Sequence, residues 1–209
     1  PQELSHTSRA CRDAMSSNST FSFPGRRRRQ SLLYDFLSIS LLTLFVVILS
    51  LLNGTWTYYP TGYDAEGHLS KIQFVAEFWP KSNWAYIWYD GMPLFRWYGP
   101  IPEHLAAFLV KATGFPSELA LTLMFLLGIA VTGIMVYLTV LSITGSSSGA
   151  LLSALLVVSS SFFWGLGIVG GFYPRVITIA IFSVALYYLF QFAKQTHERN
   201  PKRSTLVLL

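Results

Sequence analysis

Two carboxylates and an imidazole gather in the short segment TGYDAEGHL, in which Asp64, Glu66 and His68 alternate with other residues. Asp64 and His68 are four residues apart and would share one face of a helix, whereas Glu66 would point elsewhere. An ionised carboxylate here could take a proton from a hydroxyl nucleophile, or hold a divalent cation against a phosphate. Pro60 and Gly62 predict a turn just before it, so Asp64 could also be a helix cap. The two roles are compatible.

The chain as a whole has the composition of a membrane protein. The chain of 209 residues is 52% hydrophobic and 12% charged, whereas soluble domains have about 25% charged residues. Four apolar runs reach the length of about 20 residues that crosses a bilayer, and backbone groups in lipid need internal partners, so we expect helices. The expected spans are residues 33–52, 119–141, 149–168 and 176–193. The sequence thus predicts an all-α, polytopic membrane protein.

Basic residues predict how the chain crosses the membrane. The run Arg26–Arg29 precedes the first span and favours a cytoplasmic N-terminus over a nucleic-acid site. We expect residues 1–32 to be a disordered basic tail, and residues 33–209 to be a transmembrane domain of the plasma membrane. The first loop, about 53–118, would be extracytoplasmic. The last residues, STLVLL, read as the start of a fifth span, so we expect the N-terminal part of a longer protein.

Two short helices are expected within the large loop. From Asp64 to Trp79, apolar residues recur at spacings of three and four, which predicts an amphipathic helix lying at the membrane interface. These residues are Leu69, Ile72, Val75, Ala76 and Trp79. A second helix is expected from Glu103 to Ala112, and Glu103 with His104 marks its start or supplies a further metal ligand.

Aromatic residues crowd the same loop, above all in residues 83–105, NWAYIWYDGMPLFRWYGPIPEHL. Some of these rings would form an interfacial belt at headgroup level. Rings combined with Asp90, Arg96 and rigid proline turns also suit a sugar, because its C–H faces pack on aromatic rings while its hydroxyls find polar partners. Trp88 and Trp97 are the rings that we expect to shape such a pocket.

The order of these motifs resembles a known superfamily. GYDAEGHL, followed by the pattern W…W…G.PLF…Y.P.P and by uncharged helices, is similar to the start of the GT-C membrane glycosyltransferases. More narrowly, it resembles the prokaryotic membrane proteins described as 6-pyruvoyl-tetrahydropterin-synthase-related. The resemblance covers roughly residues 33–193. The GT-C enzymes have many more helices and often a soluble C-terminal domain, and the present sequence contains neither.

This resemblance implies a reaction and a set of site residues. An acidic residue in the first loop of these enzymes is the general base or a metal ligand, and the donor is a sugar on a polyprenyl phosphate. Asp64 matches that residue, with Glu66 and His68 as assisting groups, and Asp64 with Glu66 could bind Mg²⁺ or Mn²⁺. The expected substrate-binding residues are Trp88, Asp90, Arg96, Trp97 and Arg175. For Arg175 the alternative is snorkelling to lipid headgroups, and for Arg96 it is a solvated or ring-stacked position.

A non-catalytic role remains open beside the enzyme. The same loop could bind lipid or glycan, or join a larger membrane complex through its aromatic residues. A transporter is disfavoured, because the second to fourth spans contain no charged residue except Arg175 at the mouth of the last one. The partners we expect are a lipid-linked sugar donor, membrane lipids and other membrane subunits, and no nucleic acid.

Overall fold

The computed structural model describes residues 24–56, 60–80, 84–85, 91–94 and 100–199. Contacts divide the chain into two units, residues 1–35 and 36–209. The described part of the first unit is the start of helix α2 (Pro24–Leu52), which continues into the second. The other helices are α3 (Ala65–Phe78), α4 (Ile101–Thr113), α5 (Ser117–Thr144), α6 (Ser147–Val158), α7 (Ser161–Trp164), the π-helical η1 (Gly165–Val169) and α8 (Tyr173–Arg199).

Four helical stretches are long and apolar enough to cross a membrane, judged by length and composition. They are Leu32–Leu52, Ser117–Thr144, Ser147–Val169 and Tyr173–Thr196, and they confirm the number and order of the expected spans. Helix α2 begins at Pro24, so residues 24–32 are helical although their composition suggests a disordered tail. Proline suits the first helical position and arginine is a good helix former, which accounts for the earlier start.

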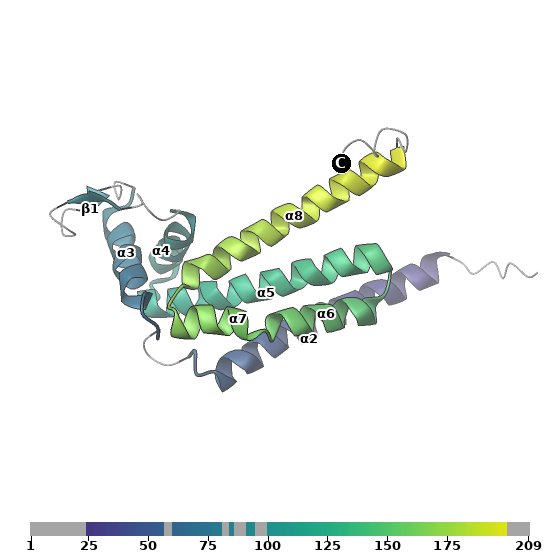
Figure 1. Cartoon of the computed structure of the whole chain (residues 1–209), viewed down its shortest axis with the longest axis horizontal. Helices are drawn as coiled ribbons and strands as arrows, with labels where there is room; N and C mark the ends of the chain where they lie inside the picture. The colour runs from purple at the N-terminus through teal and green to yellow at the C-terminus, as the bar shows by residue number, and fades with distance from the viewer. Residues whose placement is uncertain (1–23, 57–59, 81–83, 86–90, 95–99, 200–209) are drawn as a thin grey trace, which may run out of the picture. The chain divides into compact units, whose positions relative to one another are not determined.

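Helix α5 is the centre of the second unit, and both α6 and α8 pack along it (Figure 1). Glycines bring the helices close together. A Cβ added at Gly128 would lie 3.2 Å from Cγ1 of Val176 in α8. One added at Gly133 would lie 2.5 Å from Cγ1 of Val158 in α6 and 3.2 Å from Cδ2 of Leu42 in α2. Small residues in this position are typical of packing between membrane helices.

The third span is broken where we expect one continuous helix. Helix α6 ends at Val158, and Ser160 starts α7 by accepting a hydrogen bond from the backbone N–H of Phe162. The indole Nε1 of Trp164 donates to the carbonyl oxygen of Val158 at 2.8 Å. A side chain thus satisfies a backbone group that the break leaves without a helical partner, and this makes the break tolerable inside a bilayer.

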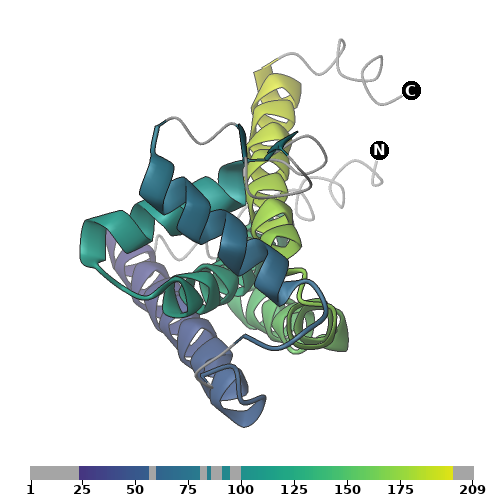
Figure 2. The same ribbon diagram turned by 90° about the vertical axis from the view of Figure 1, so that its left-hand side faces the viewer.

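Helices α3 and α4 form a separate layer across one end of the bundle (Figure 2). Helix α3 matches the expected amphipathic helix in its bounds, but its apolar residues Leu69, Ile72 and Val75 are buried inside the protein. Their burial against α4 and α5 explains the apolar periodicity better than a membrane interface does. A short antiparallel pairing of β1 (Trp84–Ala85) with β2 (Met92–Pro93) follows in the chain.

Candidate functional site

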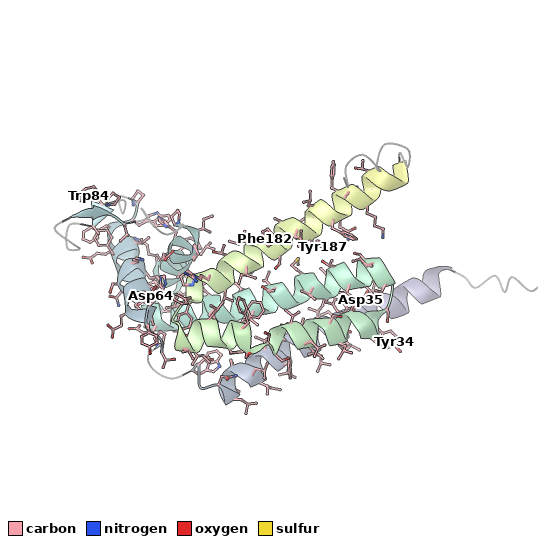
Figure 3. The ribbon with its side chains drawn as sticks, viewed as in Figure 1. Tyr34, Asp35, Asp64, Trp84, Phe182 and Tyr187 are labelled. Carbon is pink, nitrogen blue, oxygen red and sulfur yellow. The ribbon has the colours of Figure 1, made fainter. Side chains whose placement is uncertain are left out.

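Asp64 occupies the N-cap position of α3, as predicted, but its side chain makes no capping hydrogen bond. The side chain is 40% exposed, and its Oδ2 lies 3.9 Å from Nε2 of His68 one turn further along the helix. Figure 3 shows Asp64 at the end of α3 that adjoins the bundle. The carboxylate therefore faces the imidazole on the shared helix face, and a role as a helix cap alone does not account for its position.

His68 connects Asp64 to a second carboxylate on the neighbouring helix. Nδ1 of His68 lies 3.1 Å from Oε1 of Glu103 in α4, and the two side chains are 3% and 0% exposed. The other oxygen, Oε2 of Glu103, is buried and has no hydrogen-bond partner among the described residues. An exposed carboxylate, an imidazole and a buried carboxylate thus form a line from the surface into the protein.

Small residues on α4 allow the helices to approach closely enough for this contact. Ala106 and Ala107 follow Glu103 by three and four residues and are buried on the same side of α4. On α3, His68 and Ile72 are buried on one face in the same way. Positions three and four apart share a helix face, so the interface between α3 and α4 carries the ionic groups in an apolar setting.

Lys71 is the fourth ionisable residue of this cluster. It lies one turn after His68 on α3, and only 8% of the residue is exposed. Burial lowers the pKa of its ammonium, because removal from water penalises the charged form, while the charges of Glu103 and Asp64 act in the opposite direction. The cluster therefore combines two carboxylates, one imidazole and one ammonium group at the junction of α3 and α4.

The lowered pKa of Lys71 predicts a gain in stability at alkaline pH. The unfolded chain holds the Lys71 proton up to its ordinary pKa near 10.5, whereas the folded protein releases it at lower pH. Between these two values the unfolded state binds more protons, so the free energy of unfolding rises with pH. We expect the melting temperature of the wild type, relative to that of Lys71→Met, to rise between neutral pH and the ordinary pKa. Lys111→Met is the control, because Lys111 is exposed, and the same pH trend in both comparisons would contradict the assignment.

The backbone before α3 is held by the glycine-rich end of the third span. The N–H groups of Tyr63 and Asp64 donate to the carbonyls of Val169 and Gly170, at 3.4 and 3.3 Å. A Cβ added at Gly171, whose φ is +70°, would lie 2.7 Å from the backbone nitrogen of Asp64. Glycine is needed here both for the positive φ and for the close approach. We call residues 61–64 with residues 168–171 the Asp64 seat.

Side-chain hydrogen bonds reinforce the Asp64 seat. The hydroxyl of Thr61 donates to the carbonyl of Ile168 at 3.1 Å, and the hydroxyl of Tyr173 donates to the carbonyl of Thr61 at 3.0 Å. Phe125 of α5 packs edge-on against the Tyr173 ring, with ring centroids 5.1 Å apart. The position of the acidic residue is thereby linked to α5, η1 and the start of α8.

Two of the other predicted site residues, Glu66 and Arg175, lie among the described residues. Glu66 is exposed on α3. Arg175 is exposed in the first turn of α8, where its guanidinium carbon lies 4.3 Å from the centre of the Phe172 ring. Trp88, Asp90, Arg96 and Trp97, which we expect to form the sugar pocket, lie outside the described residues.

The donor groups around Asp64 do not fit a divalent cation well. Among the residues that the structure describes, no three His, Cys, Asp or Glu side chains are grouped so that they could hold a metal ion. The Lys71 ammonium interacts electrostatically with both Asp64 and Glu103, and a second cation beside it would be repelled. The predicted Mg²⁺ or Mn²⁺ at Asp64 and Glu66 therefore gains no support from these neighbours.

Sequence reasoning missed the roles of Glu103 and Lys71. We assigned Glu103 to the start of a helix, where a carboxylate is favourable. The signal that could have identified it is its register with Ala106 and Ala107, which places a carboxylate on the small, apolar face of the helix. Lys71 likewise falls between Leu69 and Ile72, on the side of α3 that its apolar residues mark as buried.

Two apolar cavities lie near α4 on the other side from Glu103. An open groove of about 340 Å³ is lined by Trp79, Pro100, Ile101, His104, Leu105 and Phe108. A smaller cavity of about 150 Å³ lies between α4, α5 and α8 and shares Leu105 with the groove. Asp64 lines neither of these two cavities, so the apolar surface and the ionic cluster occupy different sides of α4.

Comparisons with protein families, with characterised proteins and with solved structures find no match for this chain. The features that bear on its function are the Asp64–His68–Glu103 line and the apolar surface on the other side of α4.

Proposed function

We propose that this protein is a membrane glycosyltransferase of the GT-C type, which moves a sugar from a polyprenyl-phosphate donor to an acceptor on the extracytoplasmic side. The observation that carries the proposal is the line from Asp64 through His68 to Glu103. Asp64 offers an oxygen to solvent, its Oδ2 lies 3.9 Å from Nε2 of His68, and Nδ1 of His68 lies 3.1 Å from Oε1 of Glu103. Such a line can accept a proton at the surface and share it with groups inside the protein.

In the proposed reaction, Asp64 is the general base. The acceptor hydroxyl gives its proton to the carboxylate of Asp64, and the oxygen forms a bond to the anomeric carbon of the sugar. The bond from that carbon to the phosphate oxygen breaks, and polyprenyl phosphate leaves as an anion. A guanidinium group can stabilise this phosphate by paired, charge-assisted hydrogen bonds, and Arg175 and Arg96 are the candidates for this contact.

The apolar cavities support a donor with a hydrocarbon chain. The groove on α4 and the cavity between α4, α5 and α8 have almost entirely apolar walls. Ile101, Leu105 and Phe108 are exposed along the same face of α4. A polyprenyl chain gains free energy by leaving water for such a surface.

The direct test is donor consumption by the purified protein in proteoliposomes. We expect the release of polyprenyl phosphate from a set of polyprenyl-phosphate sugars when membrane-associated acceptors are supplied. The same vesicles without protein are the control. If no donor is consumed or bound, the enzymatic proposal fails.

A non-catalytic membrane subunit is the second candidate function. One observation favours it, because the two cavities described above are apolar and Asp64 does not line them. Under this alternative the protein would bind the lipid-linked sugar without consuming it. Donor binding with no release of polyprenyl phosphate in the same experiment would select this second candidate.

Replacement of Arg175 is expected to weaken donor binding. A hydrogen bond to a charged group contributes about 1.5–3 kcal/mol, so Arg175→Gln should raise the KM for the donor about 10- to 100-fold. Arg175→Lys should restore part of it, because the charge remains while the paired geometry is lost. Lys194→Gln is the matched control, since Lys194 is a cation further along α8 whose Nζ donates to the carbonyl of Ser142 at 3.1 Å. An unchanged KM in Arg175→Gln would contradict the phosphate contact.

A further inference from the structure

Glu103 is a carboxylate at a position where an apolar residue would be expected. Its side chain is 0% exposed, and Ala106 and Ala107 of the same helix face are also buried. Burial of an ionised group is costly unless the charge is paired and hydrogen-bonded. Buried ion pairs can often be replaced by apolar residues without loss of stability, so packing alone does not explain this side chain.

The described partners of Glu103 are a ring nitrogen and an ammonium group. Nδ1 of His68 lies 3.1 Å from Oε1, and Lys71 interacts electrostatically with the same carboxylate. A positive charge nearby favours the ionised form of a carboxyl group. An ionised carboxylate has no proton to donate, so the hydrogen bond requires that His68 donates from Nδ1.

This hydrogen bond determines what His68 presents to Asp64. In neutral imidazole only one ring nitrogen carries a proton, and the partner of the other nitrogen decides which one it is. With the proton held on Nδ1, Nε2 has a lone pair directed to the side of Asp64, whose Oδ2 lies 3.9 Å away. When the two side chains close to hydrogen-bond distance, a proton on Asp64 finds an acceptor in His68, whereas the opposite tautomer would offer none.

We infer that Glu103 is a positioning residue, which fixes His68 as the Nδ1–H tautomer so that Nε2 can accept the proton that Asp64 takes from the acceptor hydroxyl. Lys71 interacts electrostatically with the Glu103 carboxylate. The tautomer rests on the 3.1 Å contact between Nδ1 of His68 and the Glu103 carboxylate, whereas the transfer of the proton rests on the proposed function.

The tautomer can be measured by nitrogen NMR on the whole protein in lipid nanodiscs, with ¹⁵N-labelled histidine. The signal of His68 is assigned by its loss in His68→Gln. We expect neutral His68 to carry its proton on Nδ1 in the wild type.

The Nδ1–H population should fall in Glu103→Met, which removes the hydrogen-bond acceptor, and in Glu103→Gln, whose amide can either donate or accept. Glu77→Gln is the control, because Glu77 is an exposed carboxylate on α3, the helix that carries His68. A proton that stays on Nδ1 in both Glu103 variants would overturn the inference.

Sugar transfer gives the second readout and separates the two hypotheses. In Glu103→Met, Nε2 of His68 is no longer held as the proton acceptor, so kcat should fall about 10- to 100-fold while the KM of the donor stays unchanged. The fall in kcat should be smaller in Glu103→Gln. An unchanged kcat in both variants would overturn the role of Glu103. A wild type that shows the Nδ1–H signal without sugar transfer would refute the proposed function and leave the assigned tautomer intact.

Discussion

Replacement of Asp64 by asparagine is expected to remove nearly all sugar transfer while the protein still folds and inserts. An amide cannot take a proton at neutral pH, so kcat should fall about 10²- to 10⁴-fold, the range of a general base. Stability should change by less than about 1 kcal/mol, because a partly exposed side chain that caps no helix contributes little. The measurements are initial rates of polyprenyl-phosphate release and the melting temperature in detergent.

The matched control for Asp64→Asn is Glu77→Gln, which makes the same change from carboxylate to amide at the other end of α3. Glu77 is exposed, and we expect its variant to keep the rate of the wild type. Full activity in Asp64→Asn would exclude Asp64 as the base. A loss of activity accompanied by a large fall in melting temperature would show that the effect is structural.

Replacement of Gly171 by alanine is expected to cause a large loss of stability at the Asp64 seat. The φ angle of +70° disfavours any residue with a Cβ, and the new Cβ would lie 2.6 Å from the backbone nitrogen of Ala65. Backbone strain costs about 1–2 kcal/mol and overpacking about 1–3 kcal/mol, so we expect about 2–4 kcal/mol in total. The melting temperature should fall clearly, and transfer should fall with it because Asp64 is displaced.

Two other glycines separate the contributions of strain and crowding. Gly145 has a similar φ of +66° with no atom within 4 Å of an added Cβ, and Gly165 has neither a positive φ nor a neighbour within 4 Å. Gly145→Ala should therefore show the strain alone, about 1–2 kcal/mol. Gly165→Ala should be neutral or slightly stabilising, because alanine favours a helix. If Gly171→Ala lowers the free energy of unfolding no more than Gly145→Ala does, the close approach of Gly171 to the backbone of Asp64 and Ala65 is contradicted.

The long apolar elements could be predicted from sequence because each depends on its own residues. A run of about 20 apolar residues specifies a span without reference to its neighbours. Helix α3 was predicted within one residue at each end, from Pro60, Gly62 and Asp64 at its start and from the apolar spacing up to Trp79. The shared face of Asp64 and His68 was predicted as well, since it follows from their spacing.

The contacts between elements could not be predicted in the same way. The hydrogen bond from His68 to Glu103 joins residues 35 positions apart in the sequence, and no local pattern encodes it. At the break near Ser160, the Trp164 indole donates a hydrogen bond to the carbonyl of Val158. We interpreted the apolar face of α3 as a membrane interface, because periodicity shows that a face is apolar but not what covers it.

The Asp64 seat also has a consequence for the order in which the protein can be completed during synthesis. Thr61 and Ile168, which it joins by a hydrogen bond, are 107 residues apart. The ribosome therefore releases the acidic residue long before the carbonyls that hold its backbone, and α5 must already be inserted for η1 to pack beside it. A nascent chain that stops after α6 would carry the whole ionic cluster on α3 and α4 and still lack its anchor. The backbone of Asp64 therefore acquires these hydrogen bonds late in translation, when the glycine-rich turn emerges.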